Sequence, residues 1–198
     1  TTAGRSTKSG TTLVGACVKA GTDYRDLTGG VNWARGRIDR HPAAAVDADG
    51  RILHIWGFDS VTADLGTLLA QSFAMAEFGT PCTRARIYLE SGSGGVSGGT
   101  LASAAELFEA ASNDPEVRAV LGNPYSLAPS GERTGVDTGE QRLPRKAPLR
   151  PVWTAPSPMA PVNERVVRRS NALLDYPWGR GFRCTEVVPT GPGVGGAA

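Results

Sequence analysis

The sequence predicts an α/β protein organised around a parallel β-sheet. In the first 80 residues, short apolar runs alternate with longer segments of helical periodicity, and this alternation is typical of parallel sheets. The segment Arg51–Phe78 combines a buried strand, a polar loop and a helix in one continuous stretch. Composition agrees, because 198 residues with 40% hydrophobic side chains are sufficient for a packed core.

The first 50 residues contain two predicted helices and one strand. We expect a polar loop over Thr1–Gly10 and a helix over Thr11–Ala20, because the glycine that follows is a usual helix stop. A brief strand is predicted at Tyr24–Leu27. The second helix covers Val31–Ala48, and Pro42 must kink or interrupt it.

The stretch around which the chain is organised begins with a strand at Arg51–Trp56. The loop Gly57–Ser60 then follows the carboxyl end of that strand, where parallel sheets bind their ligands. An interpretation in which Asp59 and Ser60 only cap the next helix stays open. The apolar periodicity of that helix predicts one face lying on a sheet. The residues of this face are Leu65, Leu68, Leu69, Ser72, Phe73 and Ala76.

Strand and helix patterns return after residue 80. Polar and apolar residues alternate over Thr83–Glu90, as in a strand with one covered face. Residues 122–151 are rich in Pro, Gly and Arg and predict a long irregular excursion or lid. The other expected elements are the helices Leu101–Ala111 and Pro115–Leu121, an apolar stretch Val152–Met159, the helix Pro161–Leu174 and the strand Phe182–Val188.

We expect two structural units and a tail. Residues 1–79 form the first unit, residues 80–190 the second, and residues 191–198 are a flexible tail. The chain opens without Met on a short loop before an apolar helix, so it reads as an internal fragment of a longer protein.

The bulk numbers argue against several classes of function. A net charge of +2 does not predict nucleic-acid binding, and no apolar run is long enough for a membrane span. The three cysteines, Cys17, Cys82 and Cys184, are odd in number and far apart, which argues against a disulfide framework. With only His41 and His54 besides, we expect no metal site and a cytoplasmic protein.

The glycine-rich stretch SGSGGVSGGT permits several interpretations. Residues 95–99 match the G-x-S-x-G of a serine hydrolase with Ser97 as nucleophile, but no histidine follows His54 in the chain. A phosphate loop would need a lysine before Thr100. Two interpretations stay open: the stretch is a loop whose backbone N–H groups bind a ligand, or it is a simple connector.

Two further patterns bear on the binding of anionic ligands. No G-x-G-x-x-G follows a strand anywhere in the chain, so the sequence does not show how it would bind a dinucleotide. Arg165, Arg168 and Arg169 give the helix near the C-terminus a basic face. Such a face is usually solvated, and an anion site is the alternative.

Five stretches together resemble the saccharopine dehydrogenase-like oxidoreductases, in particular their actinobacterial branch of trans-acting enoyl reductases. These stretches are Leu13–Gly29, Gly57–Asp64, Gly94–Ser103, Ala111–Tyr125 and Val152–Leu174. The resemblance implies the C-terminal part of a Rossmann-like parallel sheet, followed by an α/β (α+β) substrate domain. It also implies that the nucleotide fingerprint belongs to residues upstream of Thr1.

The resemblance also implies site residues. Positions that match the family's cofactor side are Thr2, Ala3, Gly4, Asp26, Thr28, Gly29, Gly57, Asp59 and Ser60, with Asp64 close behind. Positions that match its substrate loop are Gly95, Ser97, Gly98 and Thr100. The chain departs from the family pattern at Gly30, where the family has Glu, and at Trp56, where it has Cys.

The function implied is NAD(P)-dependent hydride transfer to a double bond of a lipid or polyketide-like substrate. NADP or NAD would be the cofactor, bound only weakly by this chain alone. A catalytically inactive remnant or binding module is the alternative, and a serine hydrolase ranks third. The protein could also form a homo-oligomer, or associate peripherally with the inner face of the plasma membrane, and the sequence decides neither point.

Overall fold

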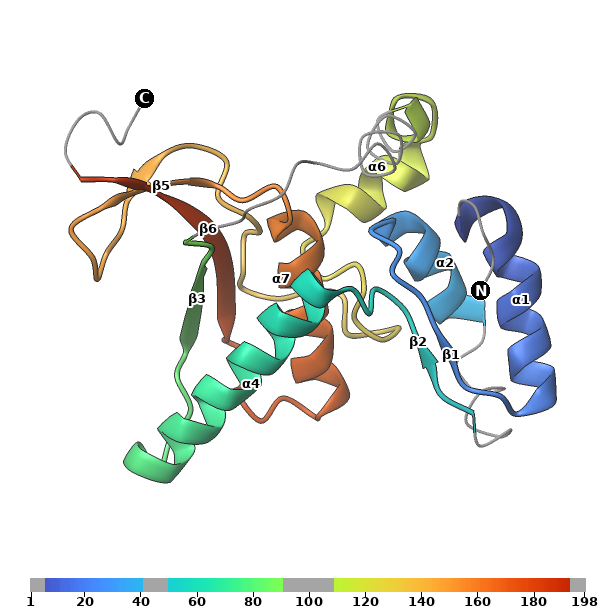
Figure 1. Cartoon of the computed structure of the whole chain (residues 1–198), viewed down its shortest axis with the longest axis horizontal. Helices are drawn as coiled ribbons and strands as arrows, with labels where there is room; N and C mark the ends of the chain where they lie inside the picture. The colour runs from blue at the N-terminus through green and yellow to red at the C-terminus, as the bar shows by residue number, and fades with distance from the viewer. Residues whose placement is uncertain (1–5, 41–49, 91–108, 193–198) are drawn as a thin grey trace.

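The computed structural model describes residues 6–40, 50–90 and 109–192, with side chains from Gly10 onward. Its elements, labelled in Figure 1, are α1 (Ser6–Ala20), β1 (Tyr24–Arg25), α2 (Val31–Arg40), β2 (Ile52–Leu53), α4 (Phe58–Phe78), β3 (Arg84–Tyr88), α6 (Pro115–Gly122), β4 (Arg145–Lys146), β5 (Trp153–Pro156), α7 (Ala160–Leu173) and β6 (Arg183–Gly191). The helix α1 begins within the predicted N-terminal loop, and the tail from residue 193 lies outside the described residues.

Two sheets organise the described residues, and the α/β class is confirmed. The strands β1 and β2 pair in parallel, with Tyr24 opposite Ile52. The second sheet has the order β3-β6-β5-β4, in which β3 and β6 are parallel and the other pairs antiparallel. The Rossmann-like assignment of the first sheet stays a prediction.

The helix α7 lies between the two sheets (Figure 1) and contributes side chains to both hydrophobic cores. Val162 and Val166 pack against the core of α1, β1 and α2, in which Leu127 is also buried. Val167 belongs to the core under β3 and β6. The first core therefore contains residues from both sides of the expected boundary at residue 79.

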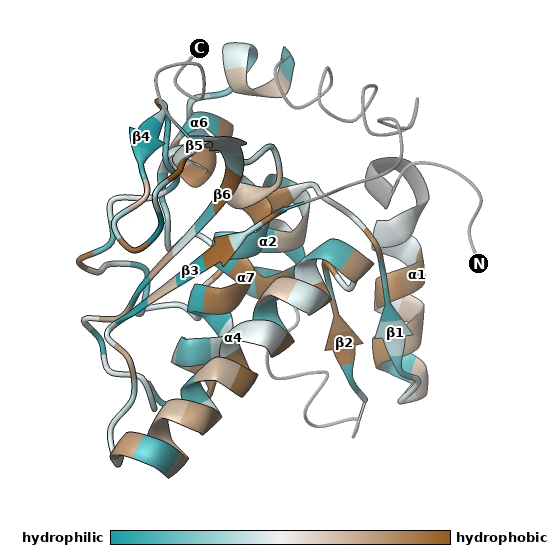
Figure 2. Ribbon diagram, turned by 60° about the vertical axis from the view of Figure 1, so that its left-hand side comes forward, coloured by the Kyte–Doolittle hydropathy of each residue, from teal (hydrophilic) through white to brown (hydrophobic). Residues whose placement is uncertain are grey.

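The buried face of α4 is not the one that its apolar periodicity predicts. Leu65, Leu69 and Phe73 are more than half exposed, and Figure 2 shows the hydrophobic colour along the outside of this helix. The buried face consists of smaller or polar residues, namely Ser60, Ala63, Thr67, Gln71 and Ala74. It packs against α7, and the Gln71 amide bonds the backbone N–H and C=O of Cys82. The predicted apolar face on a sheet is thus wrong, because small side chains let α7 approach closely.

The arginines of α7 are not a solvated basic face. Arg165 donates to the Leu121 carbonyl at 2.6 Å, and Arg169 donates to the Leu127 carbonyl at 2.8 Å. Arg165 and Arg168 are almost fully buried. They hold the start of the irregular segment 122–151 against α7, where Leu127 is 1% exposed. Between α6 and β5 this segment consists of turns and the two-residue strand β4, and its first part is packed into the core.

A buried charge cluster joins α7 to β6. Arg168 donates to Asp137 at 2.8 Å and 3.0 Å, to Glu164 at 2.8 Å and to the Cys184 carbonyl at 3.1 Å. Glu164 also accepts the backbone N–H of Glu186 at 2.9 Å. Burial raises the pKa of Glu164 to about 7, although Arg168 acts in the opposite direction.

This shift predicts a pH dependence of stability. Between the ordinary pKa of 4.5 and about 7, folded Glu164 keeps a proton that the unfolded chain releases. The free energy of unfolding should therefore fall by roughly 2–3 kcal/mol as the pH rises through that interval. Urea unfolding between pH 4.5 and pH 8 measures the slope. Glu164→Gln should flatten it, and an unchanged slope in that variant would assign the effect to another group.

Candidate functional site

The loop after β1 is held by the carboxylate of Asp26. Its Oδ1 accepts the backbone N–H of Thr28 and of Ile55, each at 3.1 Å. Its Oδ2 lies 2.6 Å from Nδ1 of His54, and both side chains are almost fully buried. Asp26 therefore ties the end of β1 to the end of β2, and its oxygens are occupied by these contacts.

His54 is enclosed by aromatic rings. The rings of Tyr24 and Trp33 meet it edge-on, with centroids 5.9 Å and 5.3 Å away. Burial and the neighbouring Asp26 raise the pKa of Tyr24 to about 12. This arrangement makes His54 a structural partner of Asp26 rather than an accessible acid or base.

The chain leaves β2 through a strained turn. Ile55 has φ +61°, a left-handed conformation that β-branched residues rarely adopt. The Trp56 N–H donates to the Asp26 carbonyl at 2.7 Å, while its ring stays 42% exposed near Arg25. Leu27, in the loop after β1, and Phe58, the first residue of α4, are also strongly exposed. The strand ends thus present an apolar surface.

The helix α4 starts without a side-chain cap. Gly57 occupies the cap position, and among the described residues no side chain forms a capping hydrogen bond there. Asp59 is exposed, whereas Ser60 is buried and donates to Oδ1 of Asn163 at 2.7 Å. The capping interpretation of Asp59 and Ser60 is therefore wrong.

The hydroxyl of Ser60 belongs to a buried polar chain that runs away from the strand ends. The amide of Asn163 donates to Glu186 at 2.7 Å, and Ser157 donates to the other oxygen of Glu186 at 2.5 Å. All four side chains are at most 4% exposed. These bonds link the start of α4 to α7, to β6 and to the residue that follows β5, so Ser60 supports the loop from inside the protein.

The structure brings part of the expected cofactor side together. Asp26, Thr28 and Gly29 follow β1, and Gly57 and Asp59 follow the adjacent β2. Thr2, Ala3 and Gly4, and the substrate-loop residues Gly95, Ser97, Gly98 and Thr100, lie outside the described residues.

Sequence reasoning missed Asn163 and Glu186 as supports of this loop. A signal was present for Glu186, because an acidic residue inside an apolar strand segment usually has a buried partner. Nothing in the sequence near Asn163 pointed to Ser60, which lies 103 positions away.

Asp59→Asn should change the free energy of unfolding by less than about 0.5 kcal/mol, as is usual at exposed positions without partners. Thermal or urea unfolding checks this. If Asp59 instead contacts a cofactor or substrate in the complete protein, the same variant should weaken binding of that ligand while melting stays unchanged. A clear loss of stability would contradict the exposed, uncapped geometry.

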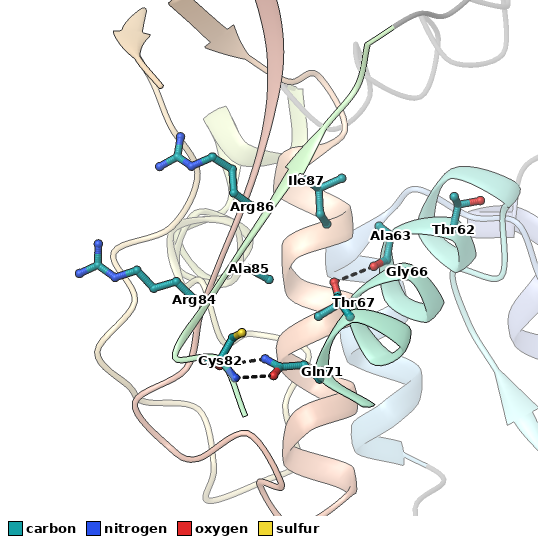
Figure 3. A pocket seen from close by; sticks show the side chains of 11 residues that line it. Thr62, Ala63, Gly66, Thr67, Gln71, Cys82, Arg84, Ala85, Arg86 and Ile87 are labelled. Atoms are coloured by element: carbon teal, nitrogen blue, oxygen red, sulfur yellow. Dashed lines mark hydrogen bonds between the residues drawn. The ribbon is translucent and has the colours of Figure 1, made fainter. Parts of the chain in front are cut away.

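A groove between α4 and β3 has a volume of about 380 Å³ (Figure 3). Ala85 and Ile87 point toward the helices, while Arg84 and Arg86 point to the other side of the strand. The side chains of Thr67 and Gln71 are already bonded to the backbone of Ala63 and Cys82. Because its polar groups are paired internally, this groove is a weaker candidate for chemistry than the strand ends.

The described residues do not form a complete cofactor site. Among residues 6–40, 50–90 and 109–192, no group of His, Cys, Asp and Glu could hold a metal ion. A dinucleotide needs a glycine-rich turn that leads into a helix N-terminus, where its pyrophosphate binds. At the N-terminus of α4 the only atoms close to the position of a Cβ on Gly57 are those of the Asp59 carboxylate, and a carboxylate repels phosphate. The strand ends therefore fit at most the part of a dinucleotide remote from its phosphates.

In the part of the chain that the structure describes, no helix has the length and apolar character that crossing a bilayer requires.

Comparison with known proteins finds relatives along almost the whole chain. A Mycobacterium tuberculosis protein provisionally named a trans-acting enoyl reductase is 44% identical over 98% of this chain and 48% of its own length. Trans-acting enoyl reductases of Mycobacterium bovis and Mycobacterium ulcerans are 37% and 38% identical over 96% of this chain and 47% of their own lengths. The chain thus spans about half the length of the curated relatives it matches. No protein-family model and no solved structure matches it.

Proposed function

The chain is homologous, over nearly its whole length, to about half of each of these trans-acting enoyl reductases, and from this premise we propose that it is part of an NAD(P)-dependent enoyl reductase. The substrate would carry a carbon–carbon double bond in a lipid or polyketide-like chain. The 44% identity to the Mycobacterium tuberculosis relative is the observation that carries the proposal. The saccharopine dehydrogenase-like family is the wider group to which we assign it.

In this proposal a reduced nicotinamide supplies the hydride when it is bound. The contribution of this chain is the apolar surface at the ends of β1 and β2, formed by Leu27, Trp56 and Phe58. Such a surface would exclude water from one side of the reacting groups. Asp26, which follows β1, holds the residues after β2 through its two contacts with His54 and Ile55. The residues that bind the pyrophosphate would lie in the half of the relatives that this chain does not span.

A chimera tests the proposal. This chain replaces the corresponding 48% of the Mycobacterium tuberculosis relative, and the product is assayed for NADPH oxidation with a 2-enoyl thioester. We expect the saturated acyl product to appear, with the intact relative as positive control. A folded chimera that binds NADPH but forms no saturated product would contradict the assignment.

A catalytically inactive binding module is the second candidate. It is favoured by Trp56, a large ring at the strand end where the family resemblance has a smaller residue, and by the full occupation of Asp26. In the chimera, Trp56→Cys separates the two candidates. Activity that appears only with Cys at this position would favour an inactive module, whereas activity with Trp56 in place would favour the reductase.

A further inference from the structure

The strand β3 lies at the edge of the second sheet, because among the described residues it pairs only with β6. The backbone N–H of Arg183 in β6 donates to the Thr83 carbonyl at 3.0 Å. Along a strand the N–H and C=O groups of successive residues point to opposite sides, so Thr83 and every second residue after it bond to β6. The residues in between, whose backbone groups point to the unpaired edge, are Arg84, Arg86 and Tyr88.

The unpaired edge of β3 borders the groove of about 380 Å³ between β3 and α4 (Figure 3). Four consecutive residues of β3, 84–87, border this groove. Since successive side chains of a strand point to opposite faces, four in a row can border one groove only if the backbone itself does. On the α4 side, a Cβ on Gly66 would contact nothing within 4 Å beyond the backbone of its own helix, and Ala70 adds only a methyl group. The groove therefore leaves room for a further strand beside β3.

The outer face of β3 carries positive charge that no described residue neutralises. Arg84 and Arg86 are exposed and point away from the helices (Figure 3), and neither forms an ion pair with a described residue. Arg183 lies opposite Arg84 in the register of β3 and β6, so like charges are neighbours on this face, which destabilises a strand pair. The hydroxyl of Tyr88, on the same face, is buried without a hydrogen-bond partner among the described residues. This face therefore lacks acceptors, and carboxylates would supply them.

We propose that the edge of β3 binds an extended acidic segment of another polypeptide, which adds a strand to the sheet and places Asp or Glu opposite Arg84 and Arg86. Edge strands bind peptides in this way, with backbone hydrogen bonds for affinity and alternate side chains for specificity. At about 3.3 Å per residue, a segment of roughly five residues matches β3 in length. The residues between its carboxylates point to the α4 side, where Ala63, Ala70 and Ile87 border the groove, so apolar side chains fit there.

A second copy of this chain does not fit the same edge. Two β3 strands paired with each other would bring the arginines of both copies to neighbouring positions, and like charges opposite each other destabilise a strand pair. A free anion such as phosphate can reach the arginines, but it would leave the backbone groups of the edge unpaired. The acidic segment matches both features, and it requires neither a cofactor nor the proposed reductase activity.

Calorimetric titration of the 198-residue chain with the acetylated, amidated peptide TEVEVET tests the proposal. The control peptide TVVEEET has the same composition and charge but lacks the alternation. We expect TEVEVET to bind at least about tenfold more tightly than the control. Amide hydrogen exchange, followed by NMR, should slow at Arg86 and Tyr88, because their N–H groups then donate to the added strand. Equal affinities for the two peptides, binding without slower exchange, or no saturable binding would each overturn the proposal.

The charges of the edge are tested by reversal. Arg86→Glu should weaken binding of TEVEVET at least about tenfold. Arg40→Glu, the same change at an exposed arginine of α2, is the matched control and should leave the affinity unchanged. The double variant Arg84→Glu/Arg86→Glu should instead bind the basic peptide TKVKVKT. Thermal melting confirms that each variant is folded, and Arg86→Gln replaces Arg86→Glu if the latter unfolds. Equal weakening by Arg40→Glu would show that only the net charge of the protein matters and would contradict the assignment.

The groove itself is tested by filling it. Gly66→Leu places a large side chain where a Cβ has free space, so the variant should fold. Its melting temperature should be unchanged or higher, because leucine favours a helix more than glycine does. Binding of TEVEVET should fall at least about tenfold, since the added strand loses its place beside α4. Unchanged affinity in a folded Gly66→Leu variant would place the peptide outside the groove and overturn the proposal.

Discussion

Arg168→Met should lower the free energy of unfolding by about 3–5 kcal/mol, the loss expected when one partner of a buried ion pair is removed. Arg168 is the guanidinium between Asp137 and Glu164, and all three side chains are almost fully buried. Without it, two carboxylates lose their cationic partner inside the protein. The Cys184 carbonyl loses a donor as well.

Urea unfolding at pH 7.5 measures this loss. Arg180→Met is the matched control, because Arg180 pairs with Glu132 at the surface and should contribute little. Adding Asp137→Asn to the Arg168→Met variant should restore part of the stability, since one unpaired charge is then removed. A loss of less than about 1 kcal/mol in Arg168→Met would contradict the buried-pair geometry.

NADPH and NADH should bind the 198-residue chain no more tightly than about 1 mM, which corresponds to only ~4 kcal/mol of binding free energy. The pyrophosphate of a dinucleotide is held mainly by a glycine-rich turn and the helix N-terminus behind it. The sequence has no such motif after a strand, and the strand ends of β1 and β2 offer mainly apolar side chains.

Nicotinamide fluorescence and calorimetry measure this affinity directly. The chimera with the Mycobacterium tuberculosis relative is the control, and it should bind about a thousandfold more tightly if the missing half supplies the pyrophosphate site. Micromolar binding by the 198-residue chain itself would instead reveal a cofactor site among residues that we have not assigned.

Local patterns predicted most of the elements correctly. The capped helix α6 begins at Pro115, and the side chain of Asp114 accepts the N–H groups of Glu116 and Val117. The parallel pairing of β1 with β2 follows the predicted alternation of strands and helices. Caps, turn residues and apolar periodicity act within a few positions of the chain, so the sequence contains them directly.

Long-range packing decided which side chains are available at the candidate site. The loop residues Asp26, Gly57 and Asp59 could be singled out from the strand-loop-helix pattern. The engagement of Ser60 with Asn163, and of Asp26 with His54, depends on residues 103 and 28 positions away. Where those distant partners are unknown, a serine or aspartate after a strand is equally suited to capping a helix, binding a ligand or supporting the loop.

The sequence by itself therefore determined the α/β class, the order of most strands and helices and the strand-loop-helix segment in which the candidate site loop lies. Only the tertiary structure decided which face of α4 is buried and that the arginines of α7 point inward. The reason is physical: local conformation depends on neighbours along the chain, whereas burial depends on the partner surface. The backbone carbonyls of residues 121–127 and the acidic groups of distant elements offer acceptors to the guanidinium groups of α7, and those of Arg165 and Arg168 are almost fully buried. The small side chains of α4 allow the close packing on α7 that leaves its leucines outside.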